Sequence, residues 1–289
     1  MADPRGPGRY RHVSFNAPLS DDRADALARR LAAAAPAEAV DIGCGWGELL
    51  LRILERSPST VGVGIDVDEE LIERGQSEAD RRGLADRVRF VPGPADQVDV
   101  PPADLVICVG SSHAVGGPDR ALEALWSWVR PGGRLLFGDG TWDRAATGDR
   151  SLVWQDMLAL PDLAGQVDRA VAAGFRPLSV EASTTGELDA FESGFLADYE
   201  EWLVAHPDHP DAEQLRAKAD EHRNRWLHGY RGGFGFAYLT LGRPQEPARR
   251  AQRVTETLVR LGSRSGARSA SRRLCSCWRS ARPSPRLGW

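Results

Sequence analysis

The residues that could carry chemistry begin with an acid and three glycines at alternate positions: Asp41, Gly43, Gly45 and Gly47. Glycine loses more conformational freedom on ordering than any other residue, so three of them this close together indicate a backbone that turns sharply or lies against another group. A short apolar run precedes them, and an amphipathic run follows to about residue 56. The pattern predicts a strand, a ligand-binding turn and a helix.

The spacing of these glycines differs from that of the dinucleotide-binding turn. That turn has the pattern Gly-x-Gly-x-x-Gly, whose third glycine would fall here at Glu48. An acid such as Asp41 is electrostatically unfavourable beside a pyrophosphate and favourable beside an ammonium group. Asp66, at the end of the next apolar run, can accept hydrogen bonds from ribose hydroxyls. The two acids predict a nucleoside with a cationic amino-acid tail and no phosphates.

The elements that must position these residues follow one another in β/α alternation. Short, non-alternating apolar strands are typical of a parallel sheet covered on both faces, and such doubly wound sheets bind ligands at the carboxyl ends of their strands. We therefore expect an α/β fold with the glycine turn at the ligand-binding edge. The expected strands are residues 39–42, 60–66, 87–91, 104–109, 134–137, 176–181 and 234–241. The expected helices are residues 21–35, 47–56, 68–82, 118–130, 163–173, 187–205 and 211–228, the first capped by Ser20.

Composition and charge restrict the class of protein. A hydrophobic content of 42% and a charged content of 27% over 289 residues are ordinary for a globular protein. Residues 1–243 carry 26 basic and 39 acidic side chains, whereas residues 244–289 carry 11 arginines and two acids. The acidic part argues against a nucleic-acid partner. The Arg- and Ser-rich end is expected to be a disordered tail, either a solvated extension or a segment that binds an anionic surface.

Three segments are expected: an irregular one at residues 1–19, a domain at 20–243 and the tail at 244–289. No apolar run approaches the roughly 18 residues of a membrane span, and the N-terminus lacks the apolar core of a secretory signal. The four cysteines show no disulfide or zinc spacing, so no metal is expected. We expect a cytoplasmic protein with reduced thiols, and the sequence leaves its oligomeric state open.

Several motifs in order resemble those of the class I S-adenosylmethionine-dependent methyltransferases, over about residues 20–243. They are VDIGCGWG at residues 40–47, Asp66 with its neighbour Val67, PGPAD at 92–96, ICVGS at 107–111 and Pro-Gly-Gly at 131–133. The resemblance implies a Rossmann-like, mostly parallel seven-stranded sheet whose one antiparallel strand is residues 234–241. It also implies a helical insertion, at about residues 186–230, that forms a lid.

The cofactor that this resemblance implies is S-adenosyl-L-methionine. By the same resemblance Asp66 binds the ribose, Val67 packs against the adenine, and Asp96 contacts the adenine amino group. The family more often has Gly-Asp-Ala at the last of these positions, and the alternative is that Asp96 is simply a turn residue. The residues implied to bind the cofactor are Asp41, Gly43, Cys44, Gly45, Gly47, Asp66, Val67, Asp96, Gly110 and Ser111.

The transfer of a methyl group from a sulfonium is an in-line displacement, in which the protein positions the acceptor and in some cases removes its proton. His113, just after the fourth expected strand, is the candidate general base, because imidazole is the side chain best suited to proton transfer near neutral pH. The alternative is a loop histidine that bonds to the backbone or to the cofactor.

The acceptor is expected to be a small molecule, methylated on nitrogen or oxygen or, less commonly, on sulfur or carbon. DNA and RNA amino-methylases of this family carry Asp/Asn-Pro-Pro-aromatic where this chain has CVGS at residues 108–111. Asp139, Trp142 and Tyr199 are the candidate substrate-binding residues. Tyr199 belongs to an aromatic stripe at helical spacing, which is either core or a pocket wall. Two alternatives stay open: a protein or RNA methyltransferase recruited through the tail, and a non-catalytic relative that binds S-adenosylmethionine.

Overall fold

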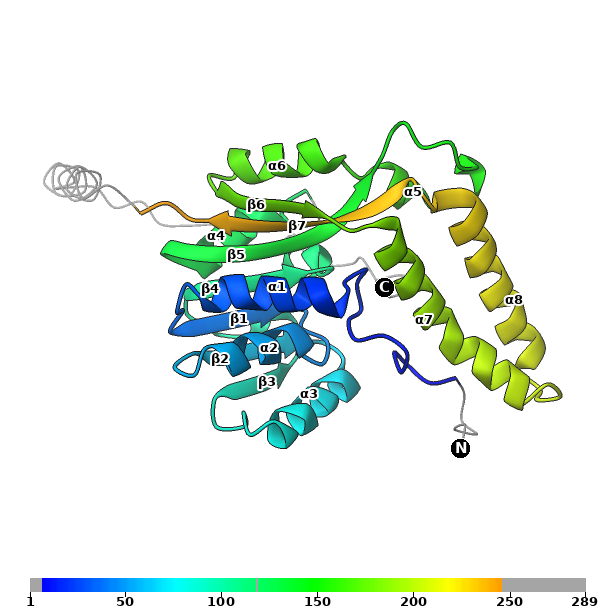
Figure 1. Cartoon of the computed structure of the whole chain (residues 1–289), viewed down its shortest axis with the longest axis horizontal. Coiled ribbons are helices and arrows are strands. Elements are labelled where there is room, and N and C mark those ends of the chain that lie inside the picture. The colour runs from blue at the N-terminus through cyan, green and yellow to red at the C-terminus, as the bar shows by residue number, and fades with distance from the viewer. Residues whose placement is uncertain (1–6, 118, 246–289) are drawn as a thin grey trace, which may run out of the picture. The chain divides into compact units, whose positions relative to one another are not determined.

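A seven-stranded sheet organises the fold in the computed structural model, which describes residues 7–117 and 119–245 (Figure 1). The strands lie in the order β3-β2-β1-β4-β5-β7-β6; β7 is antiparallel to both neighbours, and the other pairs are parallel. The predicted mostly parallel sheet with an antiparallel last strand is therefore confirmed. The strands are β1 (Glu38–Ile42), β2 (Val61–Asp66), β3 (Val88–Pro92), β4 (Ala103–Val109), β5 (Val129–Trp142), β6 (Arg176–Ala182) and β7 (Phe234–Gly242).

Helices cover both faces of this sheet. They are α1 (Asp21–Ala32), α2 (Glu48–Arg56), α3 (Glu69–Arg81), α4 (Ala121–Trp128), α5 (Gln155–Leu158), α6 (Leu163–Ala172), α7 (Thr185–Ala205) and α8 (Ala212–Asn224). Successive residues of a strand point to opposite faces. Ile107 of β4 therefore packs in one cluster with Leu27 of α1 and Leu50 of α2. Its neighbour Val106 packs with Leu125 of α4 on the opposite face.

A helical hairpin formed by α7 and α8 lies between β6 and β7 in the chain and extends away from the sheet (Figure 1). α7 begins with a capping box in which Thr184 and Glu187 satisfy each other's backbone N–H groups. Glu187 also pairs with Arg23 of α1, at 2.8 Å between Oε1 and Nε. The hairpin is thereby fixed to the first helix of the domain, and the predicted helical insertion before the last strand is present.

β5 is longer than the strand expected at residues 134–137, because it begins at Val129. The Pro-Gly-Gly segment that was expected as a turn lies within the strand, where the pairing with β4 shifts register. The Gly132 N–H donates to the carbonyl of Arg243, and the Arg243 N–H donates to the carbonyl of Gly133, both at 2.9 Å. The end of β7 therefore holds this segment in the sheet.

Two other expected segments, both helices, differ at their ends. The helix expected at residues 118–130 begins at Ala121 and ends at Trp128, and position 118 lies outside the described residues. The helix expected at 211–228 ends at Asn224 and continues as a π-helical turn, η4 (Arg225–Tyr230). Residues 7–117 and 119–244 belong to one compact unit. Residues 246–289 lie outside the described part, so the expectation of a disordered tail remains a prediction.

The ring of Phe90 on β3 explains several glycines around it. A Cβ atom added to Gly47, at the start of α2, would lie 2.4 Å from this ring, and one added to Gly64 or Gly75 would lie 2.9 Å from it. Real Cβ atoms essentially never approach a neighbour this closely. These glycines therefore allow α2, β2 and α3 to close around one aromatic side chain of the core.

Replacing Gly47 with alanine is expected to lower the free energy of unfolding by about 2–4 kcal/mol, because the new methyl group would both meet Phe90 and require a left-handed backbone. Gly47 has φ +68°, and Gly83 offers a matched control with φ +69° and no atom within 4 Å of an added Cβ. Gly83→Ala carries only the backbone strain and should lose about 1 kcal/mol. Urea denaturation measures both variants, and equal losses would contradict the role given to Phe90.

Candidate active site

The glycine turn between β1 and α2 is held by the carboxyl end of β2. The N–H groups of Gly43 and Cys44 both donate to the carbonyl of Ile65, at 2.8 and 3.0 Å. The Gly45 N–H donates to Oδ2 of Asp66 at 2.8 Å, and the Asp68 N–H donates to Oδ1 of Asp66 at 3.0 Å. Each carboxylate oxygen can accept a second hydrogen bond. The carboxylate that was predicted to bind a ribose is thus held in one orientation and keeps acceptor capacity.

The three glycines of the turn have three different surroundings. An added Cβ at Gly43 would lie 2.3 Å from the side chain of Ser111, whose hydroxyl donates to the Gly43 carbonyl at 3.0 Å. Gly47 faces the ring of Phe90. At Gly45 the nearest atom to an added Cβ is a methyl carbon of Leu71, 4.0 Å away. Gly45 is therefore the member of the set with an open face toward a ligand, whereas Gly43 and Gly47 are required by packing within the protein.

Asp41, at the end of β1, is a buried acid with 5% of its surface exposed. Burial, together with the nearby charge of Asp66, raises the pKa of its carboxyl group to about 8. Within residues 7–117 and 119–245, no hydrogen bond or ion pair to its side chain is found. A buried carboxyl group without a partner is unfavourable unless a ligand supplies one, and an ammonium group would do so. Burial also raises the pKa of the Cys44 and Cys108 thiols, which keeps them neutral.

The residues predicted to surround an adenine lie beside Asp66. Val67 is 68% exposed, so its apolar side chain is available for contact. Asp96 is exposed on the short 3-10 turn η1 (Ala95–Gln97) and makes no hydrogen bond among the described residues. The Gly93 N–H donates to the backbone carbonyl of Asp66 at 2.8 Å, so this loop is fixed next to the turn. An apolar face and a carboxylate are thus available to a planar base at this edge.

The end of β4 brings the N-terminal segment to the same edge. Gly110 has φ +70°, and an added Cβ there would lie 3.8 Å from the carbonyl of Asn16 and 3.9 Å from Phe236. The side-chain oxygen of Asn16 is buried and has no hydrogen-bond partner in the described part of the chain. Ser111 is buried and, through its bond to Gly43, positions the turn. Its contact with a cofactor stays a prediction.

The structure brings His113 and Asp139 near each other. His113 is exposed on the 3-10 turn η2 (Ser112–Val115), and Asp139 lies in β5 with its Oδ1 accepting from the Gly140 N–H at 2.7 Å. Burial raises the pKa of Asp139, although Ser112 and His113 act in the opposite direction. Trp142, by contrast, is 3% exposed and packs in the cluster below the helical hairpin. Its predicted role in substrate binding would therefore require that cluster to open.

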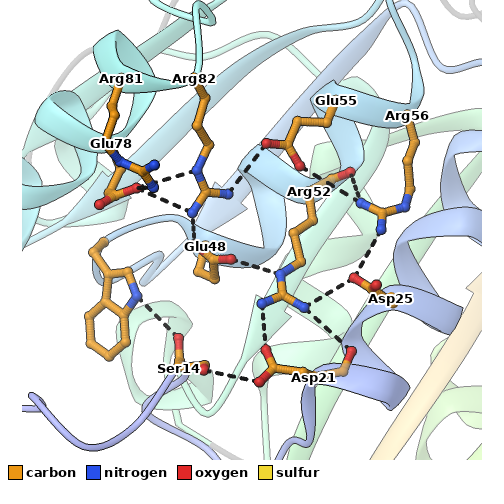
Figure 2. A network of polar contacts seen from close by, with 11 residues as sticks. Ser14, Asp21, Asp25, Glu48, Arg52, Glu55, Arg56, Glu78, Arg81 and Arg82 are labelled. Atoms are coloured by element: carbon orange, nitrogen blue, oxygen red, sulfur yellow. Dashed lines mark hydrogen bonds and ion pairs between the residues drawn. The ribbon is translucent and has the colours of Figure 1, made fainter.

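A network of ion pairs joins α1, α2 and α3 beside the turn (Figure 2). Glu48, the residue at the position of the missing third glycine, pairs with Arg52 at 2.7 Å and with Arg82. Arg52 also reaches Asp21 and Asp25 of α1. Glu48 therefore has a structural role, because its ion-pair network fixes the first turn of α2 to both neighbouring helices.

The N-terminal segment connects this network to the helical hairpin. The Trp46 Nε1–H donates to the carbonyl of Ser14 at 3.1 Å. The Tyr10 ring lies 5.6 Å from that of Trp46, and Arg11 pairs with the buried Asp198 of α7 at 3.0 Å. Sequence reasoning missed these residues, because no local pattern connects positions that are 187 residues apart. The segment lies across the glycine turn and reaches α7.

The aromatic stripe of α7 divides between two environments. Phe191 and Trp202 are buried, in agreement with core packing. Tyr199 is half-buried, with its ring 6.0 Å from that of Phe195, and burial raises the pKa of its phenol. Phe195 in turn lies 6.3 Å from Tyr10 of the N-terminal segment. This half of the stripe faces the segment that crosses the glycine turn, so the pocket-wall role remains a prediction for Tyr199.

Comparisons with known proteins agree with this arrangement. Residues 40–135 match the family model for a methyltransferase domain. The uncharacterized protein YjhP of Escherichia coli (strain K12) is 27% identical over 233 residues, which are 78% of this chain and 92% of YjhP. The 27-O-demethylrifamycin SV methyltransferase of Amycolatopsis mediterranei is 35% identical over 119 residues, 40% of this chain and 43% of that protein.

Solved structures show the same fold. The X-ray structure of YjhP matches with a TM-score of 0.71 at 24% identity, over 80% of this chain and 96% of YjhP. A methyltransferase from Geobacter sulfurreducens, crystallised with S-adenosyl-L-homocysteine, matches with a TM-score of 0.69 at 24% identity, over 79% of this chain and 93% of that one. The glycine turn flanked by two acids, the strand order with an antiparallel β7, and the match of residues 40–135 to the methyltransferase domain agree with the resemblance of this chain to the class I S-adenosylmethionine-dependent methyltransferases.

Proposed function

We propose that this protein transfers the methyl group of S-adenosyl-L-methionine to a nitrogen or oxygen atom of a small molecule. The observation that carries the proposal is the buried Asp41 carboxyl group, which has no partner in the described part of the chain and lies near Asp66, at the start of the turn in which Gly45 has an open face. When bound, the cofactor supplies an activated methyl group on a sulfonium. The protein's own residues must hold it, orient the acceptor and, for some acceptors, take a proton.

The residues at the sheet edge fit such a molecule. Asp41 matches its ammonium group, the preoriented Asp66 matches its ribose hydroxyls, and the exposed Val67 matches the apolar face of its adenine. The same residues would fit a pyrophosphate poorly, because both acids are close to the turn. His113, beside the end of β4 and near Asp139, is kept as a candidate base.

A small-molecule acceptor is supported by the charge of residues 1–243 and by the helical hairpin. Their 39 acids against 26 basic side chains disfavour a polyanionic acceptor. The relative from Amycolatopsis mediterranei is named for the methylation of a small molecule. The hairpin and the N-terminal segment meet above the glycine turn, where they would enclose an acceptor. Among the described residues, no helix is long and apolar enough to cross a bilayer.

Methyl transfer to a metabolite extract tests the proposal. With donor labelled on its methyl group, we expect the label in low-molecular-mass products, at rates within about twofold for the full chain and for a chain that ends at residue 243. The second chain keeps nearly all of the compact unit. Label in protein or RNA, lost on truncation, would instead support recruitment through the tail. Donor binding without transfer to any fraction would identify a non-catalytic relative.

A further inference from the structure

A buried polar cluster lies inside the helical hairpin, apart from the glycine turn and its two acids. Glu192 of α7 is 1% exposed. Its Oε2 lies 2.7 Å from Nε2 of His222 on α8, and its Oε1 accepts from the Tyr230 hydroxyl at 2.8 Å. The Tyr230 hydroxyl is also 3.4 Å from the same histidine nitrogen. One carboxylate thus holds an imidazole and a phenol that come from two other segments.

Joining two helices through this buried polar cluster carries a desolvation cost in free energy. Removing a carboxylate from water is expensive, and apolar residues of similar size often join helices with equal or greater stability. The surroundings are already apolar, with Met157, Leu196 and Trp226 in the same cluster as Tyr230. Burial and the adjacent carboxylate raise the pKa of Tyr230, so its hydroxyl stays protonated and donates. A buried polar group that packing does not need points to a chemical role.

The bond to Glu192 determines which nitrogen of His222 is free. A carboxylate accepts a hydrogen bond, so the proton of the neutral imidazole belongs on Nε2 and the lone pair on Nδ1. Within residues 7–117 and 119–245, Nδ1 makes no hydrogen bond, and the side chain of His222 is 21% exposed. A histidine whose one nitrogen is bound to a buried carboxylate and whose other nitrogen makes no hydrogen bond among the described residues has the arrangement of a general base.

Aromatic rings connect this histidine to the cofactor edge. The ring of His222 lies 5.3 Å from Phe195 and 6.0 Å from Trp154. Phe195 is next to Tyr10, and Tyr10 is next to Trp46 of the glycine turn. The π-helical turn η4 directly follows α8, and such turns recur at functional sites. A series of ring contacts therefore runs from His222 through Phe195 and Tyr10 to Trp46 of the turn.

We infer that His222 is the general base of the transfer, that Glu192 is its positioning residue, and that the acceptor is a planar aromatic molecule that carries a hydroxyl group. The inference rests on the proposed function and specifies its acceptor. The rings of Trp154 and Phe195 would stack on such a molecule. A phenol, with a pKa of about 10, needs help to lose its proton at neutral pH, whereas a neutral amine attacks without losing one first.

The atoms of this step balance. The acceptor O–H bond breaks, and its proton goes to Nδ1 of His222, where the carboxylate of Glu192 stabilises the imidazolium. The oxygen electron pair forms the new bond to the methyl carbon, while the sulfur–methyl bond of the donor breaks and its electron pair stays on sulfur. His222 then returns the proton to water.

His113 lies on an exposed turn, and no buried carboxylate is bonded to its ring in the described part of the chain.

The first test needs neither donor nor acceptor. Long-range ¹⁵N–¹H correlation spectra of the full-length protein report the tautomer of each neutral histidine, and His222→Ala identifies the signal among the six. We expect the Nε2–H form for His222, and we expect Glu192→Leu, which removes the acceptor, to abolish that preference. A neutral His222 with its proton on Nδ1 would overturn the inference, whatever the protein methylates.

The second test measures transfer to the active fraction of the metabolite extract. His222→Ala should lower kcat by about 10²–10⁴-fold, with donor binding by calorimetry within twofold of wild type, and added imidazole should restore part of the rate. Glu192→Gln should lower kcat with the KM for the donor unchanged. His228→Ala, an exposed histidine of the same π-helical turn, is the control and should retain full activity. The labelled product should be an aryl methyl ether.

Three results would overturn the inference while leaving the proposed function intact: normal turnover in His222→Ala, a loss that imidazole does not restore, or an N-methyl product. A loss in His113→Ala that imidazole restores, with His222→Ala active, would move the base to His113. Failure of the wild-type protein to bind the donor would instead refute the proposed function itself, and with it the acceptor role of His222.

Discussion

Replacing Asp66 with alanine is expected to weaken the binding of S-adenosyl-L-methionine by at least about 100-fold. The carboxylate fixes the turn through the N–H groups of Gly45 and Asp68, and it retains the lone pairs that two ribose hydroxyls would use. A hydrogen bond to a charged group contributes about 1.5–3 kcal/mol, so the loss of two such bonds to the ligand exceeds the roughly 2.7 kcal/mol of a 100-fold change. Isothermal titration calorimetry measures the affinity directly.

Asp99 provides the control for this measurement. It is an exposed acid that follows the next strand, and it makes no hydrogen bond or ion pair among the described residues. Asp99→Ala should therefore bind the donor as the wild type does. The unfolding temperature of both variants must be recorded, because Asp66→Ala also frees two backbone N–H groups. Equal affinities in Asp66→Ala and wild type, both folded, would show that the ribose lies elsewhere.

Local sequence patterns predicted the order of the strands and helices, because the signals for each element come from residues within one helical turn or one strand. Ser20 caps α1 by accepting from the Arg23 N–H, as its position before two acids predicts. The β1-turn-α2 unit and the end of β2 at Asp66 follow from apolar runs and glycine spacing in the same way. The extent of β5 does not, because the Pro-Gly-Gly segment is kept in the sheet by Arg243, more than 100 residues later.

Contacts between residues distant in the sequence limit the prediction of the candidate site even more than that of the strand ends. The three glycines of the turn form one pattern in the sequence, yet Gly43 is required by Ser111 and Gly47 by Phe90, and only Gly45 among the three has an open face. The partner of Gly43 lies just after β4, and the partner of Gly47 lies on β3. Both partners are too far away in the sequence for a helix or strand repeat to predict the contact. The hydrogen bond between Glu192 and His222 also joins residues that are distant in the sequence. Helical spacing predicts that each residue lies on a helix, but it does not predict that the two helices are antiparallel neighbours.

We expect the affinity for S-adenosyl-L-methionine to depend on pH through the carboxyl group of Asp41. Its pKa of about 8 means that the group is mostly protonated at pH 6–7 in the free protein, and the raised value makes the free protein less stable as pH rises from about 4 toward 8. An ammonium group favours the ionised carboxylate, so binding should release a proton from Asp41. Affinity should therefore rise with pH, by up to about tenfold per unit.

The window for this rise lies between pH 6 and about 7.5, because an α-amino group itself loses its proton near pH 7.7–8.0. Calorimetry in two buffers of different ionisation enthalpy counts the released proton. Asp41→Asn removes the titrating group and should bind about 10–100-fold more weakly at pH 7.5, since a neutral amide forms a weaker hydrogen bond to a cation than a carboxylate does. Its affinity should also change little across the window, whereas Asp99→Asn should retain the wild-type slope. If Asp41→Asn kept that slope, the proton would come from another group, and the ammonium group would have to lie away from the end of β1.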